Sequence, residues 1–154
     1  SKTSYGFYIN SGTLTYDRGT LALTNDYNAY GTYIKAGSFI FKNGTMNLSG
    51  NATSYGVYVE DANGTYTQGI YDGRGSEDAD VSDTSPYISA VGSTTGIGVR
   101  KGGGTFNYYD GKITGSTSPR AQGDITSSTE LNYQVVTKHD DVSGYDYCIL
   151  EYDR

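Results

Sequence analysis

A five-residue motif that recurs at a fixed interval constrains the fold of this chain more than any other feature. The motif Tyr-Gly-x-Tyr-Ile/Val begins at residues 5, 30 and 55, which are 25 residues apart. A looser copy, Thr-Gly-Ile-Gly-Val, begins at residue 95, one period plus a 15-residue insertion after the third. A period of this length is typical of solenoids, in which each repeat buries its apolar face against its neighbours.

Each repeat contains three short runs in which apolar and polar residues alternate. In the first repeat the motif is followed by Gly-Thr-Leu-Thr-Tyr at 12–16 and by Gly-Thr-Leu-Ala-Leu at 19–23. Turn-forming residues separate the runs, and none of them has a helical period. Three strands per turn of ~25 residues predict an all-β fold, a parallel β-helix of about four to five turns. A β-sandwich also has short strands, but it gives no reason for one fixed interval.

The repeats predict which side chains form the core. In the first strand the inward columns are Phe7, Thr32, Val57 and Ile97, then Ile9, Ile34, Val59 and Val99. In the second strand they are Leu14, Phe39, Tyr66 and Phe106, then Tyr16, Phe41 and Tyr108. In the third strand they are Leu21, Met46 and Ile113, then Leu23, Leu48 and Ile88. Thr32 is the weak position, because it places a hydroxyl in an apolar column. The repeated corner glycines are Gly6, Gly31, Gly56 and Gly96.

Two further columns are expected on the outside of the first sheet. Tyr8, Tyr33 and Tyr58 form one, which ends at Gly98. Lys35, Glu60 and Arg100 form the other, in which the sign of the charge alternates between turns. Opposite charges that face each other across strands help to fix the register.

We expect a single domain over residues 1–154, with repeats that start near 5, 30, 55 and 95. A polar loop at 72–86 is the insertion, and it leaves one corner of the third turn. The region 121–154 is expected to be a C-terminal cap, formed by a β-hairpin of runs 130–138 and 145–152 around a turn at 140–144. A cap is needed because an open sheet edge invites aggregation.

Charge and composition narrow the class of partner. A net charge of −6 argues against a nucleic-acid partner, since phosphate binding requires clustered Lys and Arg. One cysteine allows no internal disulfide, so the core has to hold the fold together. We find no signal peptide and no apolar run long enough to insert into a bilayer. Because Ser1 opens directly onto a repeat, we expect the chain to be part of a longer protein whose targeting segments lie outside it.

The blocks Tyr-Gly-x-Tyr-Ile, Gly-Thr-Leu-Thr and Gly-Thr-Met-Asn-Leu resemble repeats in large surface proteins of Gram-positive bacteria. Those proteins are similar to the pectin-lyase-like right-handed β-helices. The ending Phe-Asn-Tyr-Tyr-Asp-Gly-Lys-Ile-Thr-Gly at 106–115 also resembles the way such regions terminate. The resemblance implies a right-handed parallel β-helix, an extracellular place at the bacterial cell surface, and a role in adhesion or spacing. The wider class includes polysaccharide lyases and hydrolases.

Catalysis on a β-helix requires carboxylates paired across neighbouring turns, or a Ca²⁺ cluster with a nearby base. The acids Asp17, Asp26, Asp61, Asp72 and Asp110 lie at scattered offsets, so we predict no catalytic residues and no enzyme.

Three other features have a binding alternative beside a structural one. The acidic stretch containing Glu77, Asp78, Asp80 and Asp83 offers oxygen ligands to Ca²⁺, the one cofactor considered, but such loops are usually only solvated. His139 is most often an exposed turn residue in such a place, and Cys148 a small buried apolar one.

The column Tyr8, Tyr33 and Tyr58 is the predicted ligand-binding surface. Aromatic faces pack against sugar rings, although tyrosines also favour exposed strand positions and stack on one another. We therefore expect a secreted, non-catalytic cell-surface module that acts as a structural spacer or as an adhesin binding a glycan or a surface protein. The alternative is a carbohydrate-active β-helix enzyme, a polysaccharide lyase or hydrolase, with the insertion as one wall of a cleft.

Overall fold

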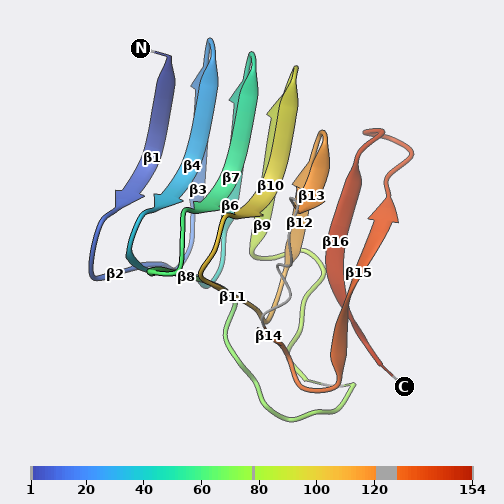
Figure 1. The fold of residues 1–154 in the computed structure, drawn as a ribbon. Coiled ribbons are helices and arrows are strands. Elements are labelled where there is room, and N and C mark those ends of the chain that lie inside the picture. The colour runs from blue at the N-terminus through green and yellow to red at the C-terminus, as the bar shows by residue number, and fades with distance from the viewer. Residues whose placement is uncertain (1, 78, 121–127, 154) are drawn as a thin grey trace.

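The computed structural model describes residues 2–77, 79–120 and 128–153, and these form sixteen strands and no helix. The chain winds through three sheets, taking one strand from each sheet in every coil (Figure 1). The first sheet contains β1 (Thr3–Ile9), β4 (Asn28–Ile34), β7 (Thr53–Val59), β10 (Thr95–Lys101) and β13 (Ser118–Arg120). The second contains β2 (Thr13–Tyr16), β5 (Gly37–Phe41), β8 (Gly64–Gln68), β11 (Thr105–Tyr108) and β14 (Ser128–Thr129).

The third sheet combines the coils with the end of the chain. It contains β3 (Thr20–Asn25), β6 (Thr45–Gly50), β9 (Tyr87–Gly92), β12 (Lys112–Gly115), β16 (Asp146–Tyr152) and β15 (Tyr133–His139). Successive coils pair in parallel, whereas β16 pairs antiparallel with β12 and with β15. The fold is therefore a parallel β-helix of about five coils, as the repeats predict, and it ends in the β-hairpin that the two alternating C-terminal runs predict. No helix among the described residues is long and apolar enough to cross a membrane.

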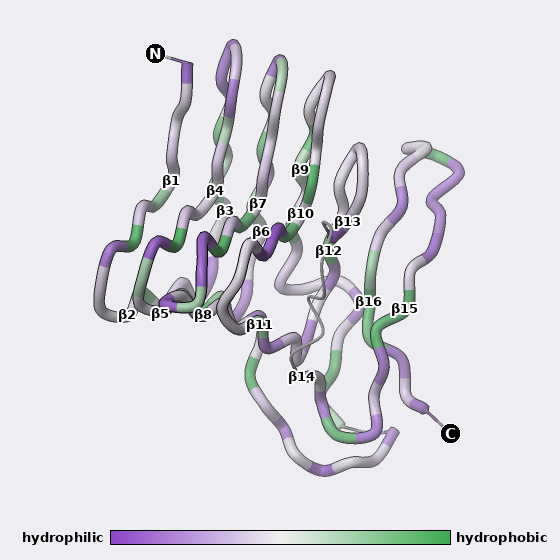
Figure 2. The backbone as a smooth tube through the Cα atoms, viewed as in Figure 1, coloured by the Kyte–Doolittle hydropathy of each residue, from purple (hydrophilic) through white to green (hydrophobic). Residues whose placement is uncertain are grey.

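The predicted columns of the second sheet are confirmed. Leu14 pairs with Phe39, Phe39 with Tyr66, and Tyr66 with Phe106. The centroids of the stacked Tyr66 and Phe106 rings are 5.2 Å apart. Hydrophobic segments recur at the same places in successive coils (Figure 2). Burial of each such side chain contributes roughly 1.5–3 kcal/mol, so the columns are the main source of stability.

The buried polar side chains include Thr32 and Gln68, which lie in the core columns. Thr32 is fully buried, and its hydroxyl donates a hydrogen bond to the sulfur of Met46 at 3.8 Å, so the hydroxyl has a partner inside the apolar column. Gln68 is also fully buried and occupies the column of Phe41 and Tyr108, a position that the sequence analysis left empty. Its amide oxygen accepts a hydrogen bond from Tyr66 at 2.8 Å, so the polar group is satisfied.

The predicted register of β10 is wrong by two residues. Val99 pairs with Val57, and Lys101 with Val59, so Val99 continues the column of Phe7, Thr32 and Val57. Ile97 lies beside Tyr55 in a separate apolar cluster outside the main core. Gly98, and not Gly96, therefore continues the column of Gly56.

The cause is the corner between β7 and β8. Gly37 pairs with Gly64, 27 residues later, so this corner is two residues longer than its predecessor. Strands β8 to β12 are each displaced by those two residues relative to a count that allows only for the insertion. The same shift moves Ile88 into the column of Met46, and Ala90 takes the place beside Leu48.

The hairpin covers the last complete coil, the fourth, at its third-sheet strand β12. Cys148 of β16 pairs with Ile113 of β12, and both are fully buried. Leu150 also packs against the main core. The hairpin thus supplies the apolar cover that a further coil would otherwise provide.

Candidate functional site

Six tyrosines form two adjacent columns on the outside of the first sheet, and we call them the tyrosine ladder. One column is the predicted Tyr8, Tyr33 and Tyr58, and the other is Tyr5, Tyr30 and Tyr55. The two columns also contact each other, as in the edge-to-face pair Tyr5 and Tyr8 at 5.4 Å between centroids. The second column escaped the sequence analysis, although the first tyrosine of each repeated motif was its signal.

The rings of the predicted column cover one another. Tyr8 and Tyr33 stack at 5.1 Å with 7° between their planes, and Tyr33 and Tyr58 stack at 5.1 Å with 2°. Because stacked rings hide their faces, the column presents mainly ring edges and hydroxyls to solvent. Tyr8 is the most exposed member, at 51%, and it lies at the N-terminal end.

Arg100 closes the other end of the ladder. Its guanidinium carbon lies 5.1 Å from the ring centroid of Tyr58 and 5.5 Å from that of Tyr55. One guanidinium nitrogen donates a hydrogen bond to the hydroxyl of Tyr55 at 2.9 Å. Two predictions are therefore wrong, because Arg100 pairs with Tyr58. Gly98 does not end the predicted tyrosine column, and Arg100 does not follow Glu60 in the predicted charged column.

Glu60 instead accepts a hydrogen bond from the hydroxyl of Tyr33. Burial raises the pKa of Tyr33, and the hydrogen bond to Glu60 raises the pKa further. Tyr33 is therefore held as a neutral hydrogen-bond donor, and the ladder is fixed both by ring stacking and by this carboxylate.

The second candidate surface is a pocket beside the connection between β8 and β9, residues 69–86, and we call it the loop pocket. Its volume is about 350 Å³. The residues that line it are Lys42, Asn43, Ile70, Tyr71, Asp72, Asp80, Ser82, Ser85 and Asp110. They come from the corner after β5, from the long connection itself, and from the corner after β11.

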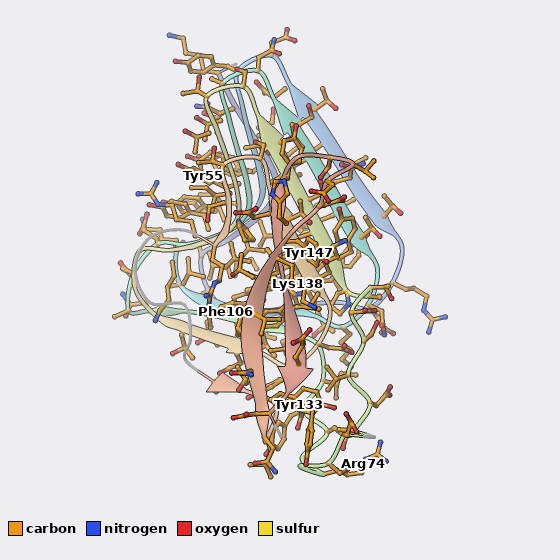
Figure 3. The ribbon with its side chains drawn as sticks, turned by 90° about the vertical axis from the view of Figure 1, so that its right-hand side faces the viewer. Tyr55, Arg74, Phe106, Tyr133, Lys138 and Tyr147 are labelled. Atoms are coloured by element: carbon orange, nitrogen blue, oxygen red, sulfur yellow. The ribbon has the colours of Figure 1, made fainter. Side chains whose placement is uncertain are left out.

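Buried Glu130 holds the start of this connection in place. Its two carboxylate oxygens accept hydrogen bonds from the backbone N–H groups of Asp72 at 2.7 Å and Gly73 at 2.6 Å. Tyr133 of β15 donates its hydroxyl to the carbonyl oxygen of Glu77 at 3.2 Å. Figure 3 shows Tyr133 at the same end of the molecule as Arg74 of this connection. The C-terminal region therefore anchors the connection as well as covering the coils.

The carboxyl groups of the loop pocket differ in their proton affinity. Arg74 donates two hydrogen bonds to Asp72, at 2.8 and 3.1 Å, and these hold the pKa of Asp72 down at about 2. Burial raises the pKa of Asp110 to about 6, even though the backbone N–H groups of Ser82 and Gly111 donate hydrogen bonds to it. The nearby carboxylates Asp80 and Glu130 also raise the pKa of Asp110.

Of the five acids that lie at scattered offsets in the sequence, the structure brings two together, because Asp72 and Asp110 line the same pocket. The 15 extra residues belong to no repeat, so the sequence gives no register from which to predict that Asp72 lies beside Asp110.

The predicted calcium ligands are divided between places. Asp80 lines the loop pocket, whereas Glu77 lines a shallow hollow with Tyr133, Glu151 and Tyr152. Asp78 lies outside the described residues, and Asp83 is exposed. Within the described part of the chain, no three His, Cys, Asp or Glu side chains are grouped as metal ligands would be. The calcium site stays a prediction.

Cys148 is a buried strand residue, as its structural interpretation has it, whereas His139 is exposed but is the last residue of β15 and not part of the turn. The Nδ1 atom of His139 lies 2.8 Å from the carboxylate of Asp146, and that hydrogen bond raises the pKa of His139. Cys148 is fully buried, and burial raises the pKa of its thiol.

Comparison with protein families, with curated proteins and with solved structures found no match. The fold is a β-solenoid. The in-register stacking of one strand per sheet in every coil decides this. The finer resemblance to bacterial surface proteins rests on the repeated motifs alone.

Proposed function

We propose that this solenoid is a non-catalytic module of a bacterial cell-surface protein, which serves as a rigid spacer and adheres to a glycan or a protein through the tyrosine ladder. Its place is extracellular. The observation that carries the proposal is the ladder itself, which runs across four neighbouring strands from Tyr8 to Arg100.

The ladder supports the spacer role because its rings bind the coils to one another on the outside. Aromatic pairs contribute about 0.5–1.5 kcal/mol each beyond their buried area. Arg100 adds a cation–π contact and a hydrogen bond at the far end. With the core columns inside and the ladder outside, adjacent coils are braced on two sides.

The adhesive role rests on the parts of the ladder that stay exposed. Tyr8 is 51% and Tyr5 is 45% exposed, and together they offer apolar ring surface and hydroxyls in one patch. Tyrosine binds partners at small entropic cost, because its ring is rigid and its hydroxyl donates or accepts a hydrogen bond.

A pulling experiment tests the spacer role. The chain is stretched from its two ends by single-molecule force spectroscopy, with Tyr33→Ala as the variant and Tyr27→Ala, an exposed tyrosine outside the ladder, as the control. We expect Tyr33→Ala to lower the unfolding force and Tyr27→Ala to leave it unchanged. Equal forces for both variants and the wild type would contradict a bracing role.

A glycan array, with a panel of host surface proteins beside it, tests the adhesive role. Binding by the wild type that Tyr8→Ala and Tyr5→Ala weaken supports the proposal. Blank panels, or binding that both variants leave unchanged, count against the ladder as the adhesive surface.

One observation favours a second candidate function, a carbohydrate-active enzyme. Asp110, whose pKa is raised to about 6, shares the loop pocket with the ionised Asp72, and a general acid requires a raised pKa of this kind. Incubation with plant and host polysaccharides in the presence of Ca²⁺ tests this. New reducing ends or unsaturated products that Asp110→Asn abolishes would establish the enzyme, and a blank panel would leave it without support.

A further inference from the structure

The loop pocket is assembled from three successive coils. Lys42 and Asn43 follow β5 in the second coil, residues 70–85 belong to the third, and Asp110 follows β11 in the fourth. A volume of about 350 Å³ lies within the range of small-molecule sites, which is about 300–1,000 Å³. The pocket lies at the corner between the second and third sheets, and the tyrosine ladder lies on the first sheet.

The walls of the pocket are fixed by hydrogen bonds within the chain. Glu130 holds the backbone at Asp72 and Gly73, and Asp72 in turn accepts a hydrogen bond from the backbone N–H of Asp80 at 3.1 Å. Asp110 accepts one from the backbone N–H of Ser82. Because the connection is anchored at its start and its middle, ligand binding would not lose free energy to the ordering of this segment.

The lining combines one apolar wall with two polar side chains, those of Lys42 and Asn43, that have no partner among the described residues. Ile70 and Tyr71 are 58% and 53% exposed, and Tyr109 supports the Tyr71 ring at 5.1 Å between centroids. Among the described residues, no hydrogen bond or ion pair engages the side chains of Lys42 and Asn43. An ammonium group and an amide thus remain available beside an aromatic ring.

The lining disfavours two classes of ligand, an anion and a calcium ion. Asp80 and Asp110 outnumber Lys42, while Arg74 neutralises Asp72, so an anionic ligand would be repelled. A calcium ion requires six to eight oxygen ligands. Asp72 accepts hydrogen bonds with both oxygens and Asp110 with one, so three of the six carboxylate oxygens of the lining are already engaged, which weakens the pocket as a site for that ion.

A neutral ring with many hydroxyls satisfies all of these conditions. Its C–H face would pack on Tyr71, and its hydroxyls would donate to Asp80 and Asp110 and accept from Asn43 and Lys42. We propose that the loop pocket is a binding site for a neutral sugar residue, most simply a single pyranose at the end or side of a glycan. The site is separate from the tyrosine ladder, and it does not depend on an adhesive role of that ladder.

Titration of the isotope-labelled chain followed by NMR tests the proposal. The probes are glucose, galactose, mannose and N-acetylglucosamine, with glucuronate and calcium chloride as the disfavoured classes. We expect one of the neutral sugars to shift the amide signals of residues 70–73 and 80–85 saturably, with a dissociation constant near ~1 mM. Glucuronate should bind about tenfold more weakly, and calcium should shift none of these signals.

Variants assign the site. Tyr71→Ala and Asn43→Ala should each weaken sugar binding by about fivefold or more, while their melting temperatures stay close to that of the wild type. Tyr27→Ala is the matched control and should bind as the wild type does.

Several results of the titrations would overturn the proposal. They are the lack of saturable binding by any neutral sugar, sugar binding that both pocket variants retain, stronger binding of glucuronate, and saturation of the same amides by calcium. Loss of sugar binding in Tyr8→Ala but not in Tyr71→Ala would also overturn it, and would instead assign the sugar to the ladder of the proposed function.

Discussion

At the residue scale, the position of Arg100 determines whether the outer surface of the first sheet ends in an isolated charge or in a contact with the tyrosine ladder. In the predicted register Arg100 is a surface charge beside Glu60, whereas in the structure its guanidinium covers Tyr58 and bonds to Tyr55. Cation–π contacts contribute about 0.5–1 kcal/mol at exposed sites, and a net hydrogen bond contributes a similar amount.

We therefore predict that Arg100→Ala lowers the free energy of unfolding by about 1–2 kcal/mol. Arg100→Lys should recover only part of the loss, because an ammonium lacks the planar fork that reaches Tyr55 while it covers Tyr58. Urea unfolding measures both variants, with the exposed Arg18→Ala as the control. A loss for Arg18→Ala as large as that for Arg100→Ala would contradict the stacking.

Asp110 gives a prediction about pH. Its pKa is 3.8 in the unfolded chain and about 6 in the folded one. Between these values the unfolded state releases a proton that the folded state keeps, so the contribution of Asp110 to stability decreases as the pH rises from about 4 to about 6.

Asp110→Asn removes this titration and keeps an oxygen that accepts from Ser82 and Gly111. The stability of the variant relative to the wild type should therefore be about 1 kcal/mol greater at pH 7 than at pH 4, a value that allows for the partial exposure of the carboxyl group. Urea unfolding at four pH values between 4 and 7 measures the difference. The exposed Asp26→Asn is the control, and a difference that does not vary with pH would refute the prediction.

Glycine is required where the backbones of neighbouring coils approach closely, as at Gly31. A Cβ atom at Gly31 would lie 2.5 Å from the carbonyl oxygen of Gly56 and 3.2 Å from a methyl group of Leu48. We predict that Gly31→Ala destabilises the protein by about 2–3 kcal/mol, because two neighbouring coils would have to separate. Gly12 has a φ of 78° but open space around it, so Gly12→Ala should cost only about 1 kcal/mol. Thermal denaturation compares them, and equal losses would contradict the close approach.

At the scale of elements, the connection between β8 and β9 behaves as an attached wall rather than a free loop. Glu130→Ala removes the acceptor for two backbone N–H groups, so we predict faster amide exchange at Asp72 and Gly73 and easier proteolysis within residues 69–86. Glu151→Ala, which breaks only the exposed ion pair with Lys138, is the control. Exchange rates that stay equal in the two variants would mean that the connection is held by other contacts.

How far the sequence predicts these elements depends on how strictly each is tied to the repeat. The columns of Leu14 and Phe39 were predictable, because alternation fixes which side chains point inward and the period fixes their neighbours. The pairing of Val99 could not be predicted, because two residues added at one corner shift the register without changing the alternation of apolar and polar residues. The loop pocket could not be predicted from the sequence. The position of Asp72 in its wall depends on a hydrogen bond to Glu130, and no repeat relates these two residues.

At the scale of the whole molecule, the two ends of the solenoid differ. The hairpin β15–β16 covers the last complete coil, whereas in the first coil the core residues Phe7, Leu14 and Leu21 are only partly buried. Their neighbours Phe39 and Met46 in the second coil are fully buried. The burial of each column therefore depends on the coil next to it, as expected for a fold whose stability is a sum of contacts between neighbours.

The register of the coils is the claim on which both candidate surfaces rest, and disulfide formation between introduced cysteines tests it most directly. The pair Tyr58→Cys with Arg100→Cys places two cysteines at directly paired positions, whereas Glu60→Cys with Arg100→Cys separates their Cα atoms by about 8 Å. Mild oxidation followed by mass spectrometry should show nearly complete bonding in the first pair and none in the second. Bonding in the second pair and not in the first would contradict the register, and with it the arginine-closed ladder.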